Sequence, residues 1–404
     1  MSSSATNGGP ANLSRRQLTV LILSLMATGI GQSLVFAILA PLGREVELSE
    51  PQITSIIAVS ALIFGLASPY WGRYSDKVGR KPVIITGLLG YAVGTLFFTS
   101  SFYAGMAGFL SGTAFYLTIM ATRVCQALVM SATGPATAAY AADNSSRETR
   151  TKTMARLGTA NSMGTIIGPA VSGALATLGL LAPLYFAAAL ALLAALFVWR
   201  QLPSTPVENL RERKTLARLR FRDPRLFMYL FTAVGLFIGF SGIQQTLGFQ
   251  LQDKMSLTGI ETAQLTGAAL MVSATFTLLI QLTVMQRTQL PPAQLIRIGM
   301  LALLVGACVI SFFETFTVLA VGMAFLGTGM ALCMPAISAG ASLAVNPEEQ
   351  GAAAGLVSSC PAIGFSVGPV AAGYLYQFDG SWASLFSACV FFLVLLTVVW
   401  KGVG

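Results

Sequence analysis

The strongest constraint on this chain is a series of apolar runs that are long enough to cross a membrane. A helix needs about 20 consecutive, mostly apolar residues to span a bilayer core, and the 404-residue sequence offers twelve such segments. Apolar residues make up 55% of the chain and charged residues only 10%, whereas a soluble domain has about 25% charged residues. We therefore expect an all-α polytopic membrane protein rather than a water-soluble one.

The spans are predicted to be helices, because the strands of a membrane barrel would give short alternating segments in place of long continuous runs. The first run is too long for the core of a signal peptide and no small-residue cleavage site follows it, so it counts as a span. The twelve spans are predicted at 18–40, 53–72, 82–102, 112–141, 154–178, 181–199, 226–250, 262–285, 293–313, 317–344, 351–376 and 381–400.

The Lys and Arg residues fall almost entirely on one side of the predicted membrane. Of the 24 such residues, only Arg44 and Lys254 lie in connections on the other side, and only Arg123 lies inside a span. By the positive-inside rule, both termini are expected in the cytoplasm and the protein in the cytoplasmic (inner) membrane. The net charge of +9 is then a signal of topology, and no nucleic-acid partner is expected.

The longest polar interval, residues 200–225, separates six predicted spans from six others. A solvated linker whose cations enforce the topology is the favoured interpretation, and a short amphipathic helix on the inner leaflet is the alternative. The predicted organisation is a cytoplasmic tail at 1–17, a six-helix bundle at 18–199, a basic linker at 200–225 and a second six-helix bundle at 226–404.

The two predicted bundles resemble each other at a constant offset of 200 residues. Five Gly or Pro positions recur in register, which indicates a duplication and two parallel repeats with a substrate path between them. The recurring positions are Gly164, Gly168, Pro169 and Gly173 with Gly364, Gly368, Pro369 and Gly373, Pro135 with Pro335, and also Glu148 with Glu348.

Several kinds of chemistry are excluded by the residues that the sequence lacks. There is no His, so a His-based nucleophile, a His-ligated metal and an imidazole proton relay are excluded. The five Cys lie in apolar runs without a C-x-x-C spacing, and no phosphate-binding G-x-x-x-x-G-K-[ST] loop occurs. We expect no catalytic residue, no metal and no cofactor, and the chain is not expected to be an enzyme.

Three motifs resemble those of the major facilitator superfamily. The loop after the second span is similar to its signature G-x-x-x-D-[RK]-x-G-R-[RK], Arg123 and Gln126 resemble an R-x-x-Q-G motif in which Ala127 replaces the Gly, and the fifth span resembles a motif that marks antiporters. The nearest subgroup in appearance is the twelve-span drug:proton antiporters. The loop signature comprises Gly72, Asp76, Lys77, Gly79, Arg80 and Lys81, and the antiporter-type motif Gly164, Gly168, Pro169 and Gly173.

The resemblance implies two pseudo-symmetric bundles that rock against each other, with a latch between them. Gly72 and Gly79 would permit the tight reversal of the loop. Asp76 would meet the start of the eleventh span in one conformation, and Arg80 would pair with an acid near the end of the fourth span, for which Asp143 is the candidate. The alternative is that the loop cations only hold the loop in the cytosol.

The antiporter-type motif has its own two interpretations. The glycines of the fifth span would form a thin helix face that lets a neighbouring backbone approach closely, and Pro169 would kink the helix. Such a face would act as a flexible seal between the bundles. Ordinary packing of small residues explains the same pattern nearly as well.

Polar side chains within the spans are the candidates for substrate binding or coupling, because burying them in a bilayer is expensive. Arg123 is the one clear intramembrane charge, and a substrate carboxylate or phosphate or a structural network of amides would compensate it equally well. The third, sixth, ninth and twelfth spans carry no Asn, Gln or charge in their cores, as expected for peripheral helices. The candidates are Arg123, Gln126, Gln32, Asn161, Gln244, Gln245 and Gln281.

These patterns predict a secondary active transporter that exports small organic molecules, such as a drug, a metabolite or a siderophore-like acid, in exchange for protons. No Asp or Glu lies in mid-membrane, so the titratable candidates for proton coupling are Asp76, Asp143 and Glu261 near helix ends. Uptake of an organic anion by symport or facilitation is the alternative within transport. A membrane sensor or scaffold that transports nothing is the hypothesis from a different functional class. The protein is expected to work as a monomer in the lipid bilayer.

Overall fold

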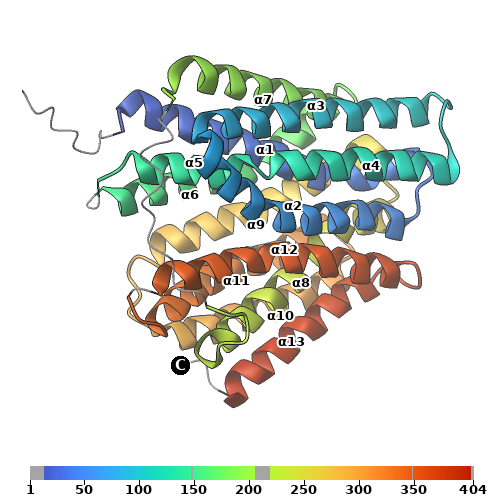
Figure 1. The fold of residues 1–404 in the computed structure, drawn as a ribbon. Coiled ribbons are helices and arrows are strands. Elements are labelled where there is room, and N and C mark those ends of the chain that lie inside the picture. Colours follow the sequence, from blue (N-terminus) through green and yellow to red (C-terminus); the bar gives the residue numbers. More distant parts are fainter. Residues whose placement is uncertain (1–12, 147–148, 205–218, 348, 402–404) are drawn as a thin grey trace, which may run out of the picture.

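The chain folds into a set of long helices that run roughly side by side (Figure 1). The computed structural model describes residues 13–146, 149–204, 219–347 and 349–401, and these contain helices and no strand. The helices are α1 (Arg15–Glu45), α2 (Glu50–Val78), α3 (Arg80–Met106), α4 (Gly112–Met130), α5 (Thr133–Asp143), α6 (Arg150–Ala176), α7 (Ala182–Gln201), α8 (Pro224–Met255), α9 (Gly259–Thr283), α10 (Pro292–Ser311), α11 (Phe316–Leu343), α12 (Gln350–Tyr376) and α13 (Trp382–Lys401).

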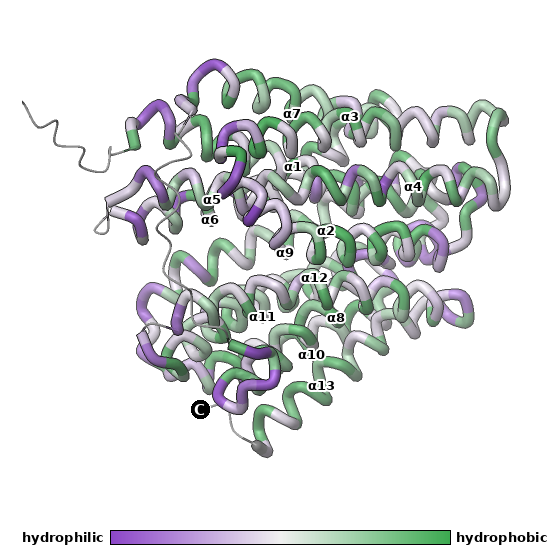
Figure 2. The backbone as a smooth tube through the Cα atoms, in the orientation of Figure 1, coloured by the Kyte–Doolittle hydropathy of each residue, from purple (hydrophilic) through white to green (hydrophobic). Residues whose placement is uncertain are grey.

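The lengths and hydropathy of these helices fit a membrane. In the described part of the chain, eleven helices are long and apolar enough to cross a bilayer, with α4 and α5 counted as one. The twelfth long helix, α6, is less apolar because it carries Arg150, Lys152 and Asn161 among its 27 residues. Apolar residues dominate the helices, and polar residues gather near their ends (Figure 2). The prediction of an all-α polytopic membrane protein with twelve transmembrane helices is confirmed.

The predicted span at 112–141 is present as one candidate membrane span, Gly112–Asp143, but the structure divides it into two helices, α4 and α5. Pro135 has no N–H to donate to the Ser131 carbonyl, and the N–H of Ala132 turns to Val129 at 3.2 Å. Helix α2 supplies replacement donors: the Ser68 hydroxyl donates to the Ser131 carbonyl at 3.4 Å and the Trp71 indole to the Leu128 carbonyl at 2.7 Å. The interruption is therefore supported by a neighbouring helix.

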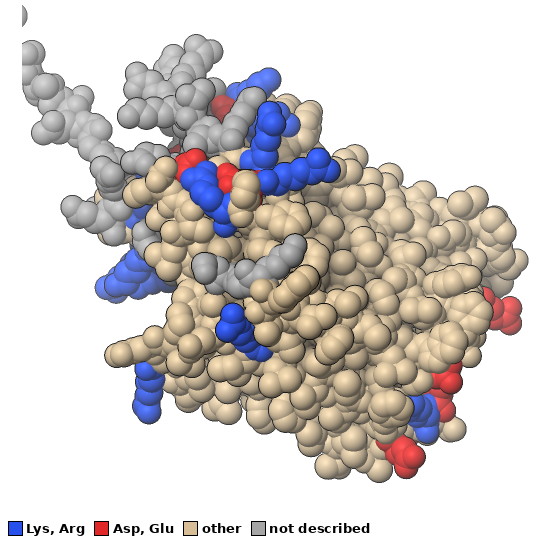
Figure 3. All heavy atoms as spheres, turned by 90° about the horizontal axis from the view of Figure 1, so that it is seen from below, with Lys and Arg blue, Asp and Glu red and all other residues tan. Residues whose placement is uncertain are grey.

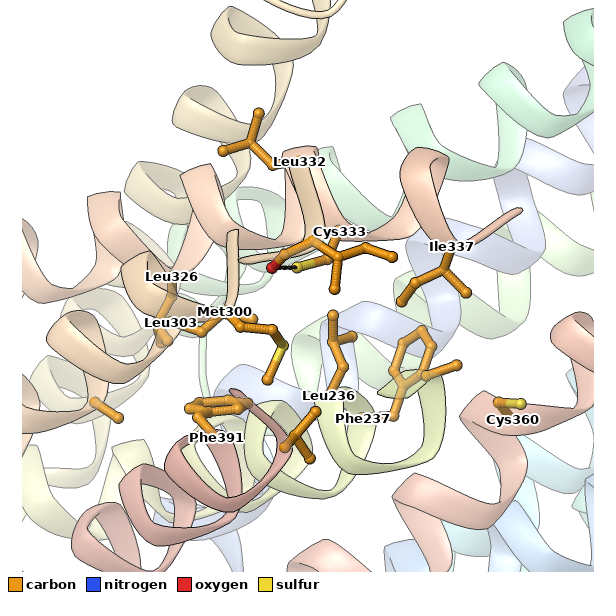
Figure 4. Packing of buried hydrophobic residues seen from close by; sticks show 14 of the residues in the cluster. Leu236, Phe237, Met300, Leu303, Leu326, Leu332, Cys333, Ile337, Cys360 and Phe391 are labelled. Atoms are coloured by element: carbon orange, nitrogen blue, oxygen red, sulfur yellow. Dashed lines mark hydrogen bonds between the residues drawn. The ribbon is translucent and has the colours of Figure 1, made fainter. Parts of the chain in front are cut away.

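Helices α1–α7 pack mainly against one another, and α8–α13 do the same. Within each set one long pair is especially close, α1 with α6 and α8 with α12, and α10 also packs along α11. Figure 4 shows part of the apolar core of the second set, in which Phe237 of α8, Leu303 of α10, Leu326 of α11 and Phe391 of α13 meet. The two sets are called the N-terminal and the C-terminal bundle below.

The repeat that the sequence indicates has a counterpart in the packing. The Ser33 hydroxyl of α1 donates to the Gly164 carbonyl of α6 at 3.4 Å, and the Ser241 hydroxyl of α8 donates to the Gly364 carbonyl of α12 at 3.1 Å. Equivalent pairs of helices, α1 with α6 and α8 with α12, thus make the same kind of hydrogen bond in the two bundles. Glu148 and Glu348, the other recurring pair, lie outside the described residues.

The two ends of the molecule differ in charge. The end at which α1 begins gathers most of the Lys and Arg, whereas the opposite end carries mainly Asp and Glu (Figure 3). We call them the basic end and the far end. The far-end cations in the described residues are Arg44, in the last turn of α1, and Lys254, in the last turn of α8. The segment 205–218, for which a linker or an amphipathic helix is predicted, lies outside the described residues.

Candidate functional site

A buried polar cluster lies between α3 and α4, about halfway along α3 and in the second half of α4. Arg123 and Gln126 are one turn apart on α4, and the Arg123 guanidinium donates to the Gln126 side-chain oxygen at 2.5 Å. The Gln126 amide nitrogen then donates to the Thr95 hydroxyl at 2.6 Å and to the Tyr91 carbonyl at 3.3 Å. Two of the candidates named from the sequence are therefore joined in one hydrogen-bonded chain.

The charge of Arg123 is neutralised by no carboxylate in the described residues. Its side chain is 6% exposed, and among those residues no Asp or Glu lies within ion-pair distance of it. The Phe98 ring lies 5.4 Å from the guanidinium carbon and gives a cation–π contact. The Arg123 Nε atom and the Tyr91 hydroxyl are both buried without a hydrogen-bond partner. The cluster thus retains unused hydrogen-bonding capacity beside a positive charge.

The contribution of α3 to this cluster was not predicted. The third span carries no Asn, Gln or charged residue in its core, which suggested a peripheral helix, yet its Thr95 and Tyr91 hold Gln126. Thr is common in membrane helices, where its hydroxyl usually bonds to the backbone of the same helix, and Tyr91 accepts from Gln126 through its backbone carbonyl. The recognisable signal is Gly94, where an added methyl group would lie 2.6 Å from the Gln126 side chain.

The remaining polar candidates are spread over several helices. Gln32 lies on α1 and is partly buried, Asn161 is exposed on α6, and Gln244 and Gln245 lie on α8. Unpartnered atoms occur here too, at the Gln244 oxygen and the Gln245 nitrogen. Gln281 lies within the span that α9 forms, but in its last turn, so it is close to the end of the span rather than away from it. No described hydrogen bond joins any of these five to Arg123.

An aromatic layer crosses from one bundle to the other near mid-membrane. The Phe36 ring of α1 stacks on Phe365 of α12 with centroids 5.9 Å apart, and Phe237 of α8 lies 6.3 Å from Phe365. Of the aromatic residues at the start of α8, Phe227 and Phe231 are exposed and stack on each other. Phe227 and Phe231 therefore lie on the surface of the molecule, and Phe237, farther along α8, is the ring of this helix that belongs to the aromatic layer.

At the basic end, the loop motif forms a compact ion-pair cluster within the N-terminal bundle. Arg80 is 1% exposed, donates to Asp143 at 2.9 Å and also pairs with Asp76. The expected contact of Arg80 with Asp143 is therefore present. Gly79 has φ +95° at the reversal between α2 and α3, a conformation that favours glycine.

Other expectations for this loop need correction or stay open. Gly72 lies inside α2 and packs near Pro135 rather than at the reversal, because α2 extends to Val78. Lys77 is exposed and Lys81 is half-buried in the first turn of α3. The contact of Asp76 with the start of the eleventh span, now α12, stays a prediction for another conformation. Glu261, named as a titratable candidate, caps α9 through Thr258 at 2.9 Å.

The antiporter-type motif divides its contacts between two neighbours. Gly164 and Gly168 lie against α1 inside the N-terminal bundle, where methyl groups would meet the Met26 carbonyl and the Ser33 hydroxyl. Farther along α6, Gly173 lies against Gln264 of α9, in the other bundle. A groove of about 280 Å³ between α6 and α9 is lined by Pro169, Gly173, Gln264 and Gly267, among others. The motif thus contributes directly to a seam between the bundles.

Comparison with known proteins places these features in a family. A model of the Major Facilitator Superfamily matches residues 21–296 and 288–403, which is nearly the whole chain. The chain belongs to the Major Facilitator Superfamily. As a member of the superfamily it is a transporter rather than an enzyme, as predicted.

Several relatives within the superfamily cover the same length. Multidrug resistance protein 1 of Bacillus subtilis is 26% identical over 95% of this chain and 96% of its own. In structure, the human organic anion transporter MFSD10 matches with a TM-score of 0.67 and 20% identity, covering 95% of this chain and 98% of its own. The nucleoside transporter NupG matches with a TM-score of 0.73 and 14% identity, covering 96% and 98%. The structural matches support the superfamily fold.

Proposed function

We propose that this superfamily member exports small organic molecules, such as a drug, a metabolite or a siderophore-like acid, in exchange for protons. The observation that carries the proposal is the buried Arg123 cluster, a positive site with two unpartnered polar atoms inside the N-terminal bundle. The similarity of this chain to a multidrug resistance protein over nearly the full length of both chains supports export. Alternating exposure of a path between the bundles would carry the substrate across.

The charge of the cluster favours neutral or anionic substrates over cationic ones. A buried guanidinium in mid-membrane costs about 2.5–3.5 kcal/mol on insertion scales, and Gln126 offsets this cost with a neutral oxygen only. An anionic or strongly accepting group on the substrate would bond to the free Nε–H of Arg123 and to the Tyr91 hydroxyl. A cation in the same place would be repelled.

Proton coupling rests on the antiporter-type motif and on energetics. The motif residues Pro169 and Gly173 lie at the seam between the bundles, where a tight contact would limit leakage. One proton that crosses about 150 mV releases about 3.5 kcal/mol, which sustains a substrate gradient of about a few hundredfold. The coupling acid is not assigned, because Asp76 and Asp143 pair with Arg80 and Glu261 caps α9.

The charge asymmetry of the two ends supports an orientation. We propose that the basic end faces the cytoplasm, so that both termini are cytoplasmic in an inner membrane. The chain would then work as a single copy, because each bundle already supplies one half of the path.

A second candidate function, uptake of an organic anion, is favoured by the same residue. Arg123 would attract an anion from either side, and the structure of MFSD10, described as an organic anion transporter, has the same fold. The two candidates differ only in direction and in whether protons move with or against the substrate.

Liposomes that contain the purified protein separate these candidates. With an imposed pH gradient, fluorescein is the anionic probe and ethidium the cationic one, and Arg123→Gln is the matched variant. Gradient-driven fluorescein movement against the proton flow, abolished by the variant, is the expected result. Movement along with protons would select the uptake candidate. Transport that ignores the gradient, or ethidium transport unchanged by Arg123→Gln, would contradict the proposal.

A further inference from the structure

A charged cluster at the far end joins the two bundles. Arg44 of α1 donates to Asp253 of α8, with Nη2 to Oδ2 at 2.9 Å and Nη1 to Oδ1 at 2.5 Å. Arg44 also pairs with Glu50 of α2 at 2.9 Å and donates to Gln252 at 3.3 Å. The Tyr376 hydroxyl of α12 donates to Asp253 at 2.6 Å. Residues of four helices, two from each bundle, therefore meet around one guanidinium.

Two aromatic rings, those of Phe249 and Tyr376, pack against this cluster. The Phe249 ring is fully buried and lies 5.1 Å from the Arg44 guanidinium carbon. Its centroid is 5.5 Å from the Tyr376 ring. The cluster thus closes over an apolar layer that water cannot readily enter, and the Arg44 side chain remains only 21% exposed.

The ion pairs of the basic end follow a different pattern. Arg80 pairs with Asp76 and Asp143, all in the N-terminal bundle. Arg225 pairs with Asp223 and Glu349, all in the C-terminal bundle, and its hydrogen bonds hold the pKa of both carboxyls below the usual range. The pair of Arg44 with Asp253 is accordingly unlike these pairs, because it crosses from one bundle to the other.

Helix dipoles make Asp253 dependent on this crossing contact. Arg44 in the last turn of α1 and Glu50 in the first turn of α2 both occupy favourable helix ends, whereas Asp253 lies in the last turn of α8, where partial negative charge disfavours a carboxylate. Arg44 compensates this unfavourable position only while the far ends of the bundles are together. Separation of the bundles would leave Asp253 without its cation.

We propose that Asp253 and Arg44, supported by Glu50 and Tyr376, form the latch that holds the far end of the transport path closed. The latch must break before the path opens to that side and must form again when it closes. This inference rests on the proposed alternating-access transport, but it assigns the residues that bias the conformational equilibrium rather than those that bind substrate.

The test measures access from the far side with a single cysteine. Gln32→Cys is introduced after the five native cysteines are replaced, and a membrane-impermeant maleimide is applied from each side of sealed vesicles. Asp253→Asn and Arg44→Gln are each expected to raise the labelling rate from the far side about tenfold, because a charge-assisted contact is lost. Lys254→Gln is the control, since the hydrogen bonds of Lys254 to the described residues go to the carbonyls of Ser311 and Phe313 in its own bundle.

The charge-reversed variant combines Arg44→Glu and Asp253→Arg with Glu50→Gln, so that the new carboxylate on α1 does not face the carboxylate of Glu50. It rebuilds the pair and is expected to return labelling to the slow rate of the parent. If a single variant fails to fold, the labelling rate of the reversed variant still tests whether this pair holds the far end closed. Parent-like labelling of folded single variants, or fast labelling of the folded reversed variant, would overturn the latch. Labelling needs no substrate, so an intact latch with no fluorescein transport would disprove the proposed function alone.

Discussion

The interface of α3 with α4 and the interface of α10 with α11 are equivalent parts of the repeat, but one is polar and the other is apolar. In each bundle, glycines of the first helix let the second approach closely: Gly94 lies against Gln126, and Gly306 lies against Leu326. The position of Gln126 on α4 and that of Leu326 on α11 differ by the same 200 residues as the sequence repeat. The two interfaces therefore share a backbone arrangement.

The side chains at this shared arrangement differ consistently. At the 200-residue offset, Arg123 corresponds to Met323 and Gln126 to Leu326. At the 212-residue offset that relates Gly94 to Gly306, Tyr91 corresponds to Leu303 and Thr95 to Ala307. The four C-terminal counterparts are buried and apolar. Leu303 and Leu326 lie together in the core that Figure 4 shows. The apolar interface demonstrates that the packing needs no polar group. A charge and an amide are costly in a membrane, so their presence at the interface of one bundle and not at its counterpart supports the proposed role of Arg123 and Gln126 in transport.

The largest effect is expected when the N-terminal interface is converted to its counterpart. The triple variant Thr95→Ala, Arg123→Met, Gln126→Leu removes the three side chains that are joined by hydrogen bonds and supplies at these positions the apolar side chains of the C-terminal bundle. Replacement of a complete buried network by apolar residues is often neutral or stabilising, so the melting temperature should stay equal or rise. Fluorescein transport should fall at least about thirtyfold, because the buried charge that would bind the anion is gone.

The matched control is Met323→Leu in the C-terminal bundle, which should leave both stability and transport close to the parent. Fluorescein transport by the triple variant at the parental rate would show that the polar interface is structural. A large loss of stability in the triple variant would lead to the same conclusion, since packing would then depend on the polar groups.

A smaller effect, of opposite sign for stability, is expected when only one partner is removed. Gln126→Leu leaves the Arg123 guanidinium without its acceptor at 2.5 Å in a site that is 6% exposed. A lost hydrogen bond to a buried charged group costs about 2–3 kcal/mol, so thermal unfolding in detergent should occur several degrees lower. The triple variant should be more stable than this single variant, because the two changes are strongly coupled.

Leu326→Met at the equivalent C-terminal position serves as the comparison for this measurement. It conserves volume and should change stability by less than about 1.5 kcal/mol. Equal stability of Gln126→Leu and the parent would mean that Arg123 finds another acceptor, and the assignment of Gln126 as its essential partner would fail.

The sequence predicts the parts of this molecule that depend on composition and on short motifs. The twelve spans follow from apolar length, and the contact of Arg80 with Asp143 follows from the loop motif, as confirmed in the ion pair at 2.9 Å. Both depend on residues whose chemistry leaves few alternatives: long apolar runs have no other stable environment, and a buried Arg requires a nearby acceptor.

Contacts between distant segments could not be predicted in the same way. Thr95 and Tyr91 enter the polar cluster only because Gly94 brings α3 close to Gln126. Asp253 meets Arg44 across 209 positions of sequence, and nothing in either local sequence specifies the partner. The interruption between α4 and α5 depends on Ser68 and Trp71 of another helix, whereas α11 continues unbroken through Pro335 at the equivalent position. A proline alone was therefore an insufficient signal.

The smallest effect on stability is expected at the interruption between α4 and α5, where the N-terminal bundle differs from the C-terminal one. Trp71→Phe keeps the ring but removes the donor to the Leu128 carbonyl at 2.7 Å, a carbonyl whose usual partner, the N–H of Ala132, is bonded elsewhere. The expected cost is about 1 kcal/mol. In the C-terminal bundle, Thr277→Val removes a comparable donor, which lies 3.0 Å from the Gly327 carbonyl. That carbonyl lies inside the continuous helix α11, so it keeps the backbone donor of its own helix. The loss of stability caused by Thr277→Val should therefore be close to zero. Thermal unfolding of both variants, measured side by side, checks the difference; an equal shift for the two would mean that the interruption does not depend on the donor from α2.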